Sequence, residues 1–378
     1  MTTGVSGYYS DIRSIQFEDH KGRNASYFFQ IEKKFFKKLS TSLGVRLEYF
    51  SIDSVATESN MNIFDQMFGK RLVDRDLTSP IHPVARIGLN YQVHEATYIR
   101  GSFGQGYRFP TIAEKYVFTQ RSGITVFPNY LVTPETGISA ELGIKQGFKI
   151  SKWLCFVDLA AFITQYKDMM DFTFGFYLPD TINGGYRPLA EGESLAPDQF
   201  ETAVGFQSQN VTDSRISGVE ISTLGTGKIF NIPVNFIIGY VYINPVDLNS
   251  ESKPKLFHRA DSVNLLEFRS RHSAKADIET SYKGVNLGVS LVYNSFIEKL
   301  PDVTAQLAPG IAEYRSLELI EKKLQGDITL DIRAGYDITE DFKVNLICKN
   351  VLNREYTVRP GKLEPPRNIS LQLAYNLK

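Results

Sequence analysis

The sequence lacks net charge and is poor in cysteine. Its 378 residues contain 42 Lys and Arg against 42 Asp and Glu, and only two cysteines, Cys155 and Cys348. A nucleic-acid binder needs a basic excess to displace the counterions of the phosphates, so this balance argues against a nucleic-acid partner. Two cysteines are too few for a disulfide framework.

Residue sets typical of catalysis or metal binding are also missing. No Ser/His/Asp set, nucleophile elbow or pair of carboxylates can be argued from spacing. The histidines are scattered and show no metal-ligand spacing. We therefore predict no enzyme, no metal site and no cofactor. The five histidines are His20, His82, His94, His258 and His272.

Long apolar runs are absent. No stretch of about eighteen apolar residues occurs, so the sequence predicts no transmembrane helix. The first residues, MTTGVSGYYSDIRS, lack the basic start, apolar core and cleavage site of a secretory signal. A helical membrane protein is excluded by this pattern, whereas a membrane β-barrel is not.

What the sequence does contain is long period-2 alternation. In GDITLDIRAGYDI, apolar residues of one parity oppose Thr329, Asp331 and Arg333 of the other. About ten residues at ~3.3 Å each, tilted near 45°, cover roughly 23–25 Å, the height of an outer-membrane apolar band. Soluble sandwiches use strands of about five or six residues, so these longer strands with charges at their centres favour a transmembrane antiparallel β-barrel.

The connections alternate between short turns and long loops, as periplasmic turns and outer loops do in such barrels. The long ones cover about 53–81, 108–135, 179–202, 247–268, 298–326 and 352–365. We expect thirteen strands, near 24–33, 41–52, 82–92, 96–107, 136–148, 154–178, 203–226, 232–246, 269–282, 285–297, 327–337, 342–351 and 366–377. A bacterial barrel usually has an even number, so we expect either a fourteenth strand at 1–10 or missing upstream strands.

The stretch GQGYRF raises a choice between a phosphate-binding loop and a barrel strand. Phe109 stands where a dinucleotide fingerprint needs its third glycine, and the upstream residues alternate in type. We therefore place the stretch in a strand. Its small residues leave room on the lumen face, or else ease strand curvature. The residues predicted to face the lumen are Arg100, Gly104, Gly106 and Arg108.

Five motifs in order resemble the barrel of TonB-dependent outer-membrane receptors. The family's G-[FY]-R-x-P-T-x-x-E-x-Y signature is followed by N-x-x-L-x-P-E, by strands similar to AAFITQYKDMMDF and RISGVEIS, and by a closing segment similar to KNVLNREY…PG…PPR. Leu377 and Lys378 depart from the aromatic end that many such barrels have. The first signature stands here as Gly106, Tyr107, Arg108, Pro110, Thr111, Glu114 and Tyr116, and the second as Asn129, Leu131, Pro134 and Glu135.

The resemblance implies a 22-stranded barrel in the bacterial outer membrane, of which 1–378 would be one C-terminal barrel domain without the plug. It implies active uptake of a scarce ligand, such as a ferric siderophore or cobalamin. The implied partners are the TonB–ExbB–ExbD complex, acting through the plug, together with outer-membrane lipid and a small ligand such as a metal chelate.

Ligand capture is expected from charged and aromatic loop residues, which could recognise an anionic or aromatic chelate. They are Arg121, Phe127, Tyr130, Tyr186 and Arg187. Two alternatives remain open. One is a passive outer-membrane pore of about fourteen strands, and the other is a soluble carbohydrate-binding β-protein.

Overall fold

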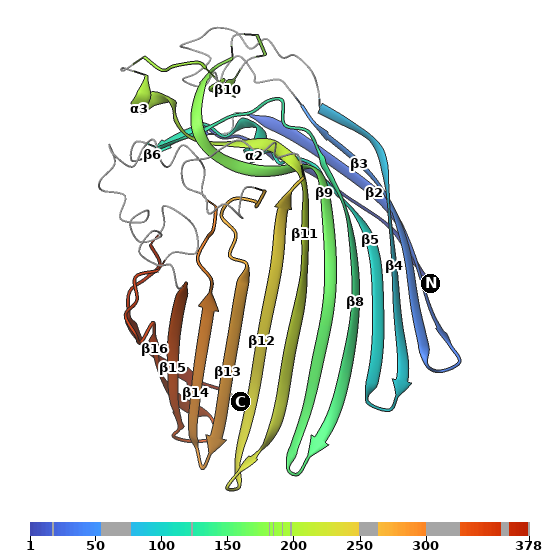
Figure 1. Cartoon of the computed structure of the whole chain (residues 1–378), viewed down its shortest axis with the longest axis vertical. Helices are drawn as coiled ribbons and strands as arrows, with labels where there is room; N and C mark the ends of the chain where they lie inside the picture. Colours follow the sequence, from blue (N-terminus) through green and yellow to red (C-terminus); the bar gives the residue numbers. More distant parts are fainter. Residues whose placement is uncertain are drawn as a thin grey trace.

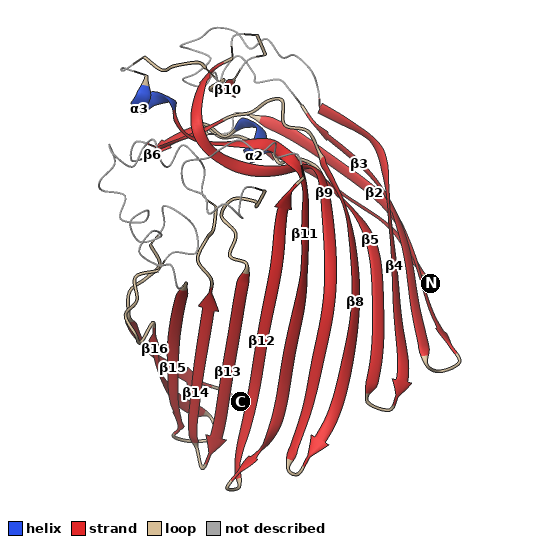
Figure 2. Ribbon diagram, in the orientation of Figure 1, coloured by secondary structure: helices blue, strands red, loops and turns tan. Residues whose placement is uncertain are grey.

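The computed structural model is a curved β-sheet of 17 strands with two short helices at one end (Figures 1 and 2). It describes the chain apart from residues 17–18, 54–76, 122–123, 181, 184, 191, 197–198, 249–263, 300–325, 357–362 and 377–378. Within the described residues, no helix is long and apolar enough to cross a membrane.

Fourteen long strands form the wall, because three of the 17 strands have only three or four residues. The predicted thirteen strands are confirmed, and residues 2–12 supply the fourteenth. The wall strands are β1 (Thr2–Ile12), β2 (His20–Phe35), β3 (Leu39–Ile52), β4 (Leu77–His94), β5 (Thr97–Arg108), β8 (Glu135–Ile150), β9 (Trp153–Pro179), β11 (Val204–Ile229), β12 (Ile232–Asp247), β13 (His272–Tyr282), β14 (Val285–Asn294), β15 (Asp327–Asp337), β16 (Phe342–Lys349) and β17 (Asn368–Tyr375).

Wall strands pair antiparallel in chain order. β5 pairs with β8, and β9 pairs with β11, past the short strands between them. Among the described residues, β1 pairs only with β2 and β17 only with β16, so these two strands are the edges of the sheet. Figure 1 shows tight hairpin turns at one end of the wall and long connections at the other, which we call the apical end.

The two faces of the wall differ as the alternation predicts. One face exposes apolar side chains along whole strands, such as Leu142 at 64% and Leu371 at 65%. The other face is polar and lines a concave recess of about 930 Å³ that includes Ser42, Asn90 and Ser102. In the described part of the chain, no second sheet covers the apolar face. A soluble sandwich would bury it, so that alternative is wrong.

Two of the predicted long loops contain ordered elements, which the alternation did not reveal. The connection 108–135 holds α2 (Ile112–Tyr116), β6 (Thr119–Arg121) and β7 (Ile124–Phe127). The connection 179–202 holds β10 (Tyr186–Pro188) and most of α3 (Phe200–Ala203). β9 and β11, with 27 and 26 residues, continue beyond the wall and pair with these elements.

Candidate functional site

The described part of the connection between β5 and β8 folds across the strand tops. We call this segment, residues 109–134 apart from 122–123, the apical strap. It starts with Pro110, which cannot donate to a strand ladder and so ends the pairing of β5. Thr111 then caps α2. The Thr111 hydroxyl accepts from the Glu114 amide at 3.1 Å, and the Glu114 carboxylate accepts from the Thr111 amide at 2.8 Å. This capping box satisfies two amides that a helix start leaves unpaired.

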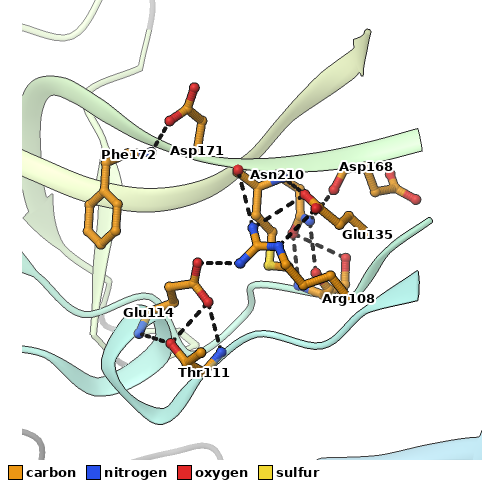
Figure 3. Close-up of polar contacts among 10 residues, drawn as sticks. Arg108, Thr111, Glu114, Glu135, Asp168, Asp171, Phe172 and Asn210 are labelled. Atoms are coloured by element: carbon orange, nitrogen blue, oxygen red, sulfur yellow. Dashed lines mark hydrogen bonds and ion pairs between the residues drawn. The ribbon is translucent and has the colours of Figure 1, made fainter. Parts of the chain in front are cut away.

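Arg108 connects the strap to the wall (Figure 3). Its guanidinium donates to Glu114 Oε1 at 2.5 Å and to Glu135 Oε1 at 2.8 Å. The other oxygen of Glu135 accepts from the Met170 amide at 2.7 Å. The arginine and the two glutamates of the sequence motifs therefore join the end of β5, the helix α2, the start of β8 and the middle of β9.

The surroundings of Glu114 favour its ionised form. Burial by itself raises the pKa of the Glu114 carboxyl, but the hydrogen bonds from the Thr111 amide and from the Arg108 guanidinium outweigh burial, so the pKa is lowered. Glu114 thus stays ionised beside Arg108, as a charge-assisted hydrogen bond requires.

Asn210 holds the strap at the point where β9 and β11 lose register. The pairing of β9 with β11 shifts between Asn210 and Ser214, and Asp168 has a positive φ of 54°. The Asn210 side chain donates to the carbonyls of Thr133 and Asp168 at 2.9 and 2.8 Å, and it accepts from the Thr133 amide at 2.8 Å. The irregular pairing therefore places Asn210 where it can hydrogen-bond the backbone at the end of the strap.

The other side of the strap is attached to the tops of β2 and β3. Tyr116 stacks on the buried His20 with a centroid distance of 3.7 Å, and its hydroxyl donates to the Asp53 carbonyl at 3.2 Å. Phe109 stacks on Phe50 at 4.0 Å. The strap thus spans from β2 and β3 on one side to β9 and β11 on the other.

Buried polar groups hold the strap together and attach it to β11. The ammonium of Lys115, a residue that is 2% exposed, donates to the carbonyls of Tyr130 and Val132 at 2.5 and 3.2 Å. The fully buried Gln207 of β11 donates to the carbonyls of Pro128 and Tyr186 at 2.9 and 2.7 Å. Because unpaired buried polar groups destabilise a fold, these contacts specify one conformation of the strap.

The polar face of the wall carries crossed ion pairs. Arg100 of β5 donates to Glu141 of β8 at 2.9 Å and to Asp158 of β9 at 2.5 Å. To reach Asp158, its guanidinium lies across Gly143 of β8, where a Cβ would approach Arg100 Cζ to 2.7 Å. One arginine therefore links three strands.

This arrangement of an arginine, a glycine on the next strand and an acceptor on the strand beyond occurs twice more. In both cases the three residues lie opposite one another in register, as a straight row across the sheet. We call the three sets the arginine rungs. The two further rungs are Arg86 across Gly44 to Gln30, at 2.5 Å, and Arg333 across Gly288 to Glu279, at 2.8 Å.

A family model described as "TonB dependent receptor-like, beta-barrel" matches residues 2–351. This chain belongs to that family. Members of the family are receptors and transporters of the outer membrane of Gram-negative bacteria, and the wall described above is therefore an outer-membrane barrel wall. A search of curated protein sequences gives no match.

Solved structures with the same fold are distant in sequence. The copper transporter OprC has a TM-score of 0.61 and 12% identity over 95% of this chain and 48% of its own. The hemophore receptor HasR of Serratia marcescens, in complex with its hemophore and heme, has 0.59 and 13% over 99% and 58%. The ferripyoverdine receptor of Pseudomonas aeruginosa has 0.56 and 12% over 94% and 39%. The barrel thus spans between 39% and 58% of these structures.

The structure places the residues predicted to face the lumen on the polar parity of β5. Arg100 lines the concave recess. A Cβ at Gly104 or Gly106 would have ordinary contacts of 3.8 and 3.9 Å, so nothing described in this chain requires glycine there. Arg108 does not present an unengaged positive charge to the interior, because Glu114 and Glu135 hold its guanidinium.

Two residues predicted to offer stacking surfaces are buried, so this interpretation of them is wrong. Phe127 is 1% exposed and packs on Tyr177 and Tyr186, at centroid distances of 5.2 and 4.6 Å. Tyr130 is 7% exposed and packs on Tyr116 at 5.6 Å. Both rings belong to the interior of the strap, which the sequence alone did not reveal as a packed unit.

The remaining predicted ligand residues lie at the apical end. Tyr186 is half-buried and stacks on Phe118 at 6.0 Å, and burial raises the pKa of its hydroxyl. Arg187 is half-exposed and donates two hydrogen bonds to Glu193, at 2.7 and 2.8 Å. Arg121 ends β6, and its side chain lies outside the described residues.

The pair of Arg187 and Glu193 gives a pH prediction. The hydrogen bonds from Arg187, with one from the Ala190 amide, lower the pKa of Glu193 from 4.5 to about 2. Since the folded-state pKa is the lower one, the stabilisation is complete above the unfolded value of 4.5 and is lost as the pH falls through about 2. We expect the carboxyl carbon shift of Glu193 to titrate near 2, and to return toward the ordinary value in Arg187→Ala. An ordinary midpoint in the unmodified chain would contradict this.

Sequence reasoning missed three residues that organise the site, namely Lys115, Gln207 and Asn210. Lys115 lies inside a recognised motif but at one of its unspecified positions. Gln207 and Asn210 lie in a run of polar residues in GFQSQNVTDS and carry no distinguishing signal. Their role depends on contacts between segments about 80 residues apart, such as the 79 residues from Pro128 to Gln207.

Proposed function

We propose that this barrel is the transmembrane wall of an energised transporter that imports a scarce ligand, such as a ferric siderophore or another metal chelate. In this proposal, residues 1–378 act as one barrel domain. The TonB–ExbB–ExbD complex supplies the energy through a plug inside the barrel. The lumen-facing residues Arg100, Gly104, Gly106 and Arg108 then lie toward that plug.

The observation that carries the proposal is the combination of an ordered strap at the apical end with a charged, crossed inner wall. A passive pore needs an unobstructed water-filled lumen, and an ordered strap across the strand tops gives selectivity instead. Two of the three arginine rungs pair the guanidinium with carboxylates, and in the third Arg86 donates to the neutral amide of Gln30, so the inner face is polar there and the rung arginines are all hydrogen-bonded. Such a surface can contact the plug without forming strong ion pairs to it, so the plug can still be displaced during transport.

The ligand class is supported by analogy of fold alone. The similar structures include a copper transporter, a hemophore receptor with heme and a ferripyoverdine receptor, all of which handle metals. At the apical end, Tyr186, Arg187 and Arg121 remain our proposed ligand contacts. Phe127 supports one of them, Tyr186, by packing on its ring.

Uptake by living cells tests the proposal. Cells that express the barrel together with its plug are given radioactive ferric chelates or copper, with TonB present or deleted. We expect accumulation only with TonB, and a reduction of about tenfold in Arg121→Ala/Arg187→Ala, as expected for two charged contacts. Arg354→Ala, which changes an arginine in the connection between β16 and β17, is the control and leaves uptake unchanged.

The alternative function has its own readout. A passive pore of about fourteen strands would give a steady current in a planar bilayer in the absence of TonB. Steady current combined with TonB-independent uptake would contradict our proposal and favour the pore. Accumulation that requires TonB, with no steady current, supports the energised transporter.

A further inference from the structure

At the end of the wall opposite the strap, the hairpin turns between β2 and β14 are rich in lysine, whereas the β15–β16 turn at residues 338–341 holds Glu340 and Asp341 and no lysine. Five turns connect strands between β2 and β14, at residues 36–38, 95–96, 151–152, 230–231 and 283–284. We count their charges together with those of the two strand residues on either side of each turn. These segments hold three, none, two, one and one lysine, against a single acidic residue, Glu95. In the described residues, no ion pair joins these lysines to a carboxylate. The lysines are Lys34, Lys37, Lys38, Lys149, Lys152, Lys228 and Lys283.

Two of these turns also carry an exposed aromatic ring at the tip. Phe36 is 93% exposed and Phe230 is 96% exposed. Both have a left-handed backbone, with φ of 49° and 47°, and the residues that follow them, Lys37 and Asn231, have positive φ as well. Two successive positive φ values are typical of type I′ hairpin turns, which strongly prefer Asn-Gly. A bulky ring in this conformation is strained, and its exposure to water adds a second penalty.

The lysines and rings are continuous with the apolar outer face. Trp153 begins β9 beside one of these turns and packs on Phe236 at 5.7 Å. Ile150, the last residue of β8 and the partner of Trp153 across this hairpin, is largely exposed. Lys152 donates to Asn231 Oδ1 of the neighbouring turn at 3.4 Å, so the two turns lie side by side.

Short turns of outer-membrane barrels lie on the periplasmic side, at the headgroups of the inner leaflet. Aromatic rings prefer this interfacial layer, and lysines extend their ammonium groups into it. We propose that these turns form a lipid-binding rim that takes up anionic phospholipid headgroups of the inner leaflet, with Phe36 and Phe230 inserted between the lipids. Positive charge near an anionic membrane surface is attractive within a Debye length, which explains the clustered lysines. Insertion into lipid explains why two strained rings stand exposed.

The single tryptophan of the chain, Trp153, provides a direct test because it lies within the rim. The full chain is placed in bilayers of phosphatidylethanolamine with a minor fraction of phosphatidylglycerol. Bromine is carried on the acyl chains of one lipid or the other, and Trp153 quenching reports the local lipid composition. We expect phosphatidylglycerol to be enriched about threefold around Trp153 relative to the bulk, and the enrichment to fall toward one in high salt.

Charge substitutions then distinguish lipid binding at the rim from a general attraction between the protein and anionic lipid. The variant Lys37→Gln/Lys38→Gln/Lys152→Gln removes three of the seven lysines and should clearly lower the enrichment. The matched control Lys21→Gln/Lys167→Gln/Lys349→Gln removes three exposed lysines from the apical side of the wall, where Lys167 pairs with Thr136 at the start of β8, and should leave the enrichment intact. The proposal is overturned if the unmodified chain shows no enrichment, or if both triple variants lower it equally.

The phenylalanines need a different readout. Glycine adopts positive φ without strain, so Phe36→Gly and Phe230→Gly should resist urea better than the parent chain in detergent micelles. In bilayers the order should reverse, because the glycine variants lose the inserted rings. If the glycine variants are more stable in both environments, the rings have no role in lipid binding. If an acidic protein binds the turns while lipid quenching shows no enrichment, the partner is a protein and the lipid proposal is wrong.

Discussion

Replacing Gly205 with alanine is expected to detach β7 from β11. A Cβ at Gly205 would overlap the carbonyl of Thr125, with which it is paired, and would contact the Phe127 ring at 2.9 Å. The obstruction is backbone, which cannot rotate away, so we expect overpacking of about 3 kcal/mol, at the upper end of its usual range. The measurement is hydrogen exchange of the β7 amides, which should accelerate about 100-fold.

Gly104→Ala and Gly106→Ala are the matched controls for this experiment. The added Cβ would meet its nearest atoms at 3.8 and 3.9 Å, which are normal contact distances. Both variants should exchange the β7 amides at the parent rate. If Gly205→Ala also retains the parent rate, the parallel pairing of β7 with β11 is not what holds the strap at that side.

Replacing Arg108 with alanine is expected to release α2 from the wall. Glu114 and Glu135 would lose their shared cation, and both carboxylates are mostly buried, at 17% and 12% side-chain exposure. Breaking a buried ion pair destabilises by about 3–5 kcal/mol, and because Arg108 is 41% exposed we expect about 2 kcal/mol. Exchange of the α2 amides should therefore accelerate about 30-fold.

The double variant Arg108→Ala/Glu135→Gln separates the loss of the pair from the cost of an unpaired carboxylate. It should recover part of the lost protection, because one unpaired charge is then removed. Arg187→Ala is the control for removing an arginine from an exposed pair, and α2 should exchange as in the parent chain. Equal exchange in Arg108→Ala and the parent would show that the strap is held without this cluster.

The wall could be predicted closely from the sequence because one rule governs each of its strands. Lipid on one side and a polar lumen on the other impose strict alternation over ten or more residues, which is visible without any long-range information. The expected strand at 136–148 became Glu135–Ile150, and the one at 327–337 was confirmed at both ends. β1 was harder because its sequence, TTGVSGYYSDI, alternates weakly.

The strap could not be predicted in the same way, since its conformation depends on contacts between distant segments. The motif residues Arg108, Glu114 and Glu135 were recognised, but not that they bind one another. Phe127 resembles an exposed loop aromatic in sequence, and only the pairing of β7 with β11 buries it. Local patterns report what surrounds a strand, whereas a packed loop is defined by its partners.

The arginine rungs bear on a problem that alternation leaves unsolved. A register shift of one residue turns the apolar side chains of a strand toward the lumen. A shift of two residues returns every side chain to the face it occupies in the native register. At Arg333, such a shift would exchange Gly288 for Asn286 or Ser290, and the guanidinium would lose its path to the third strand. Each rung therefore forms only in the observed strand register. During insertion into the membrane, the rungs disfavour the two-residue register shift that the apolar–polar alternation alone would permit.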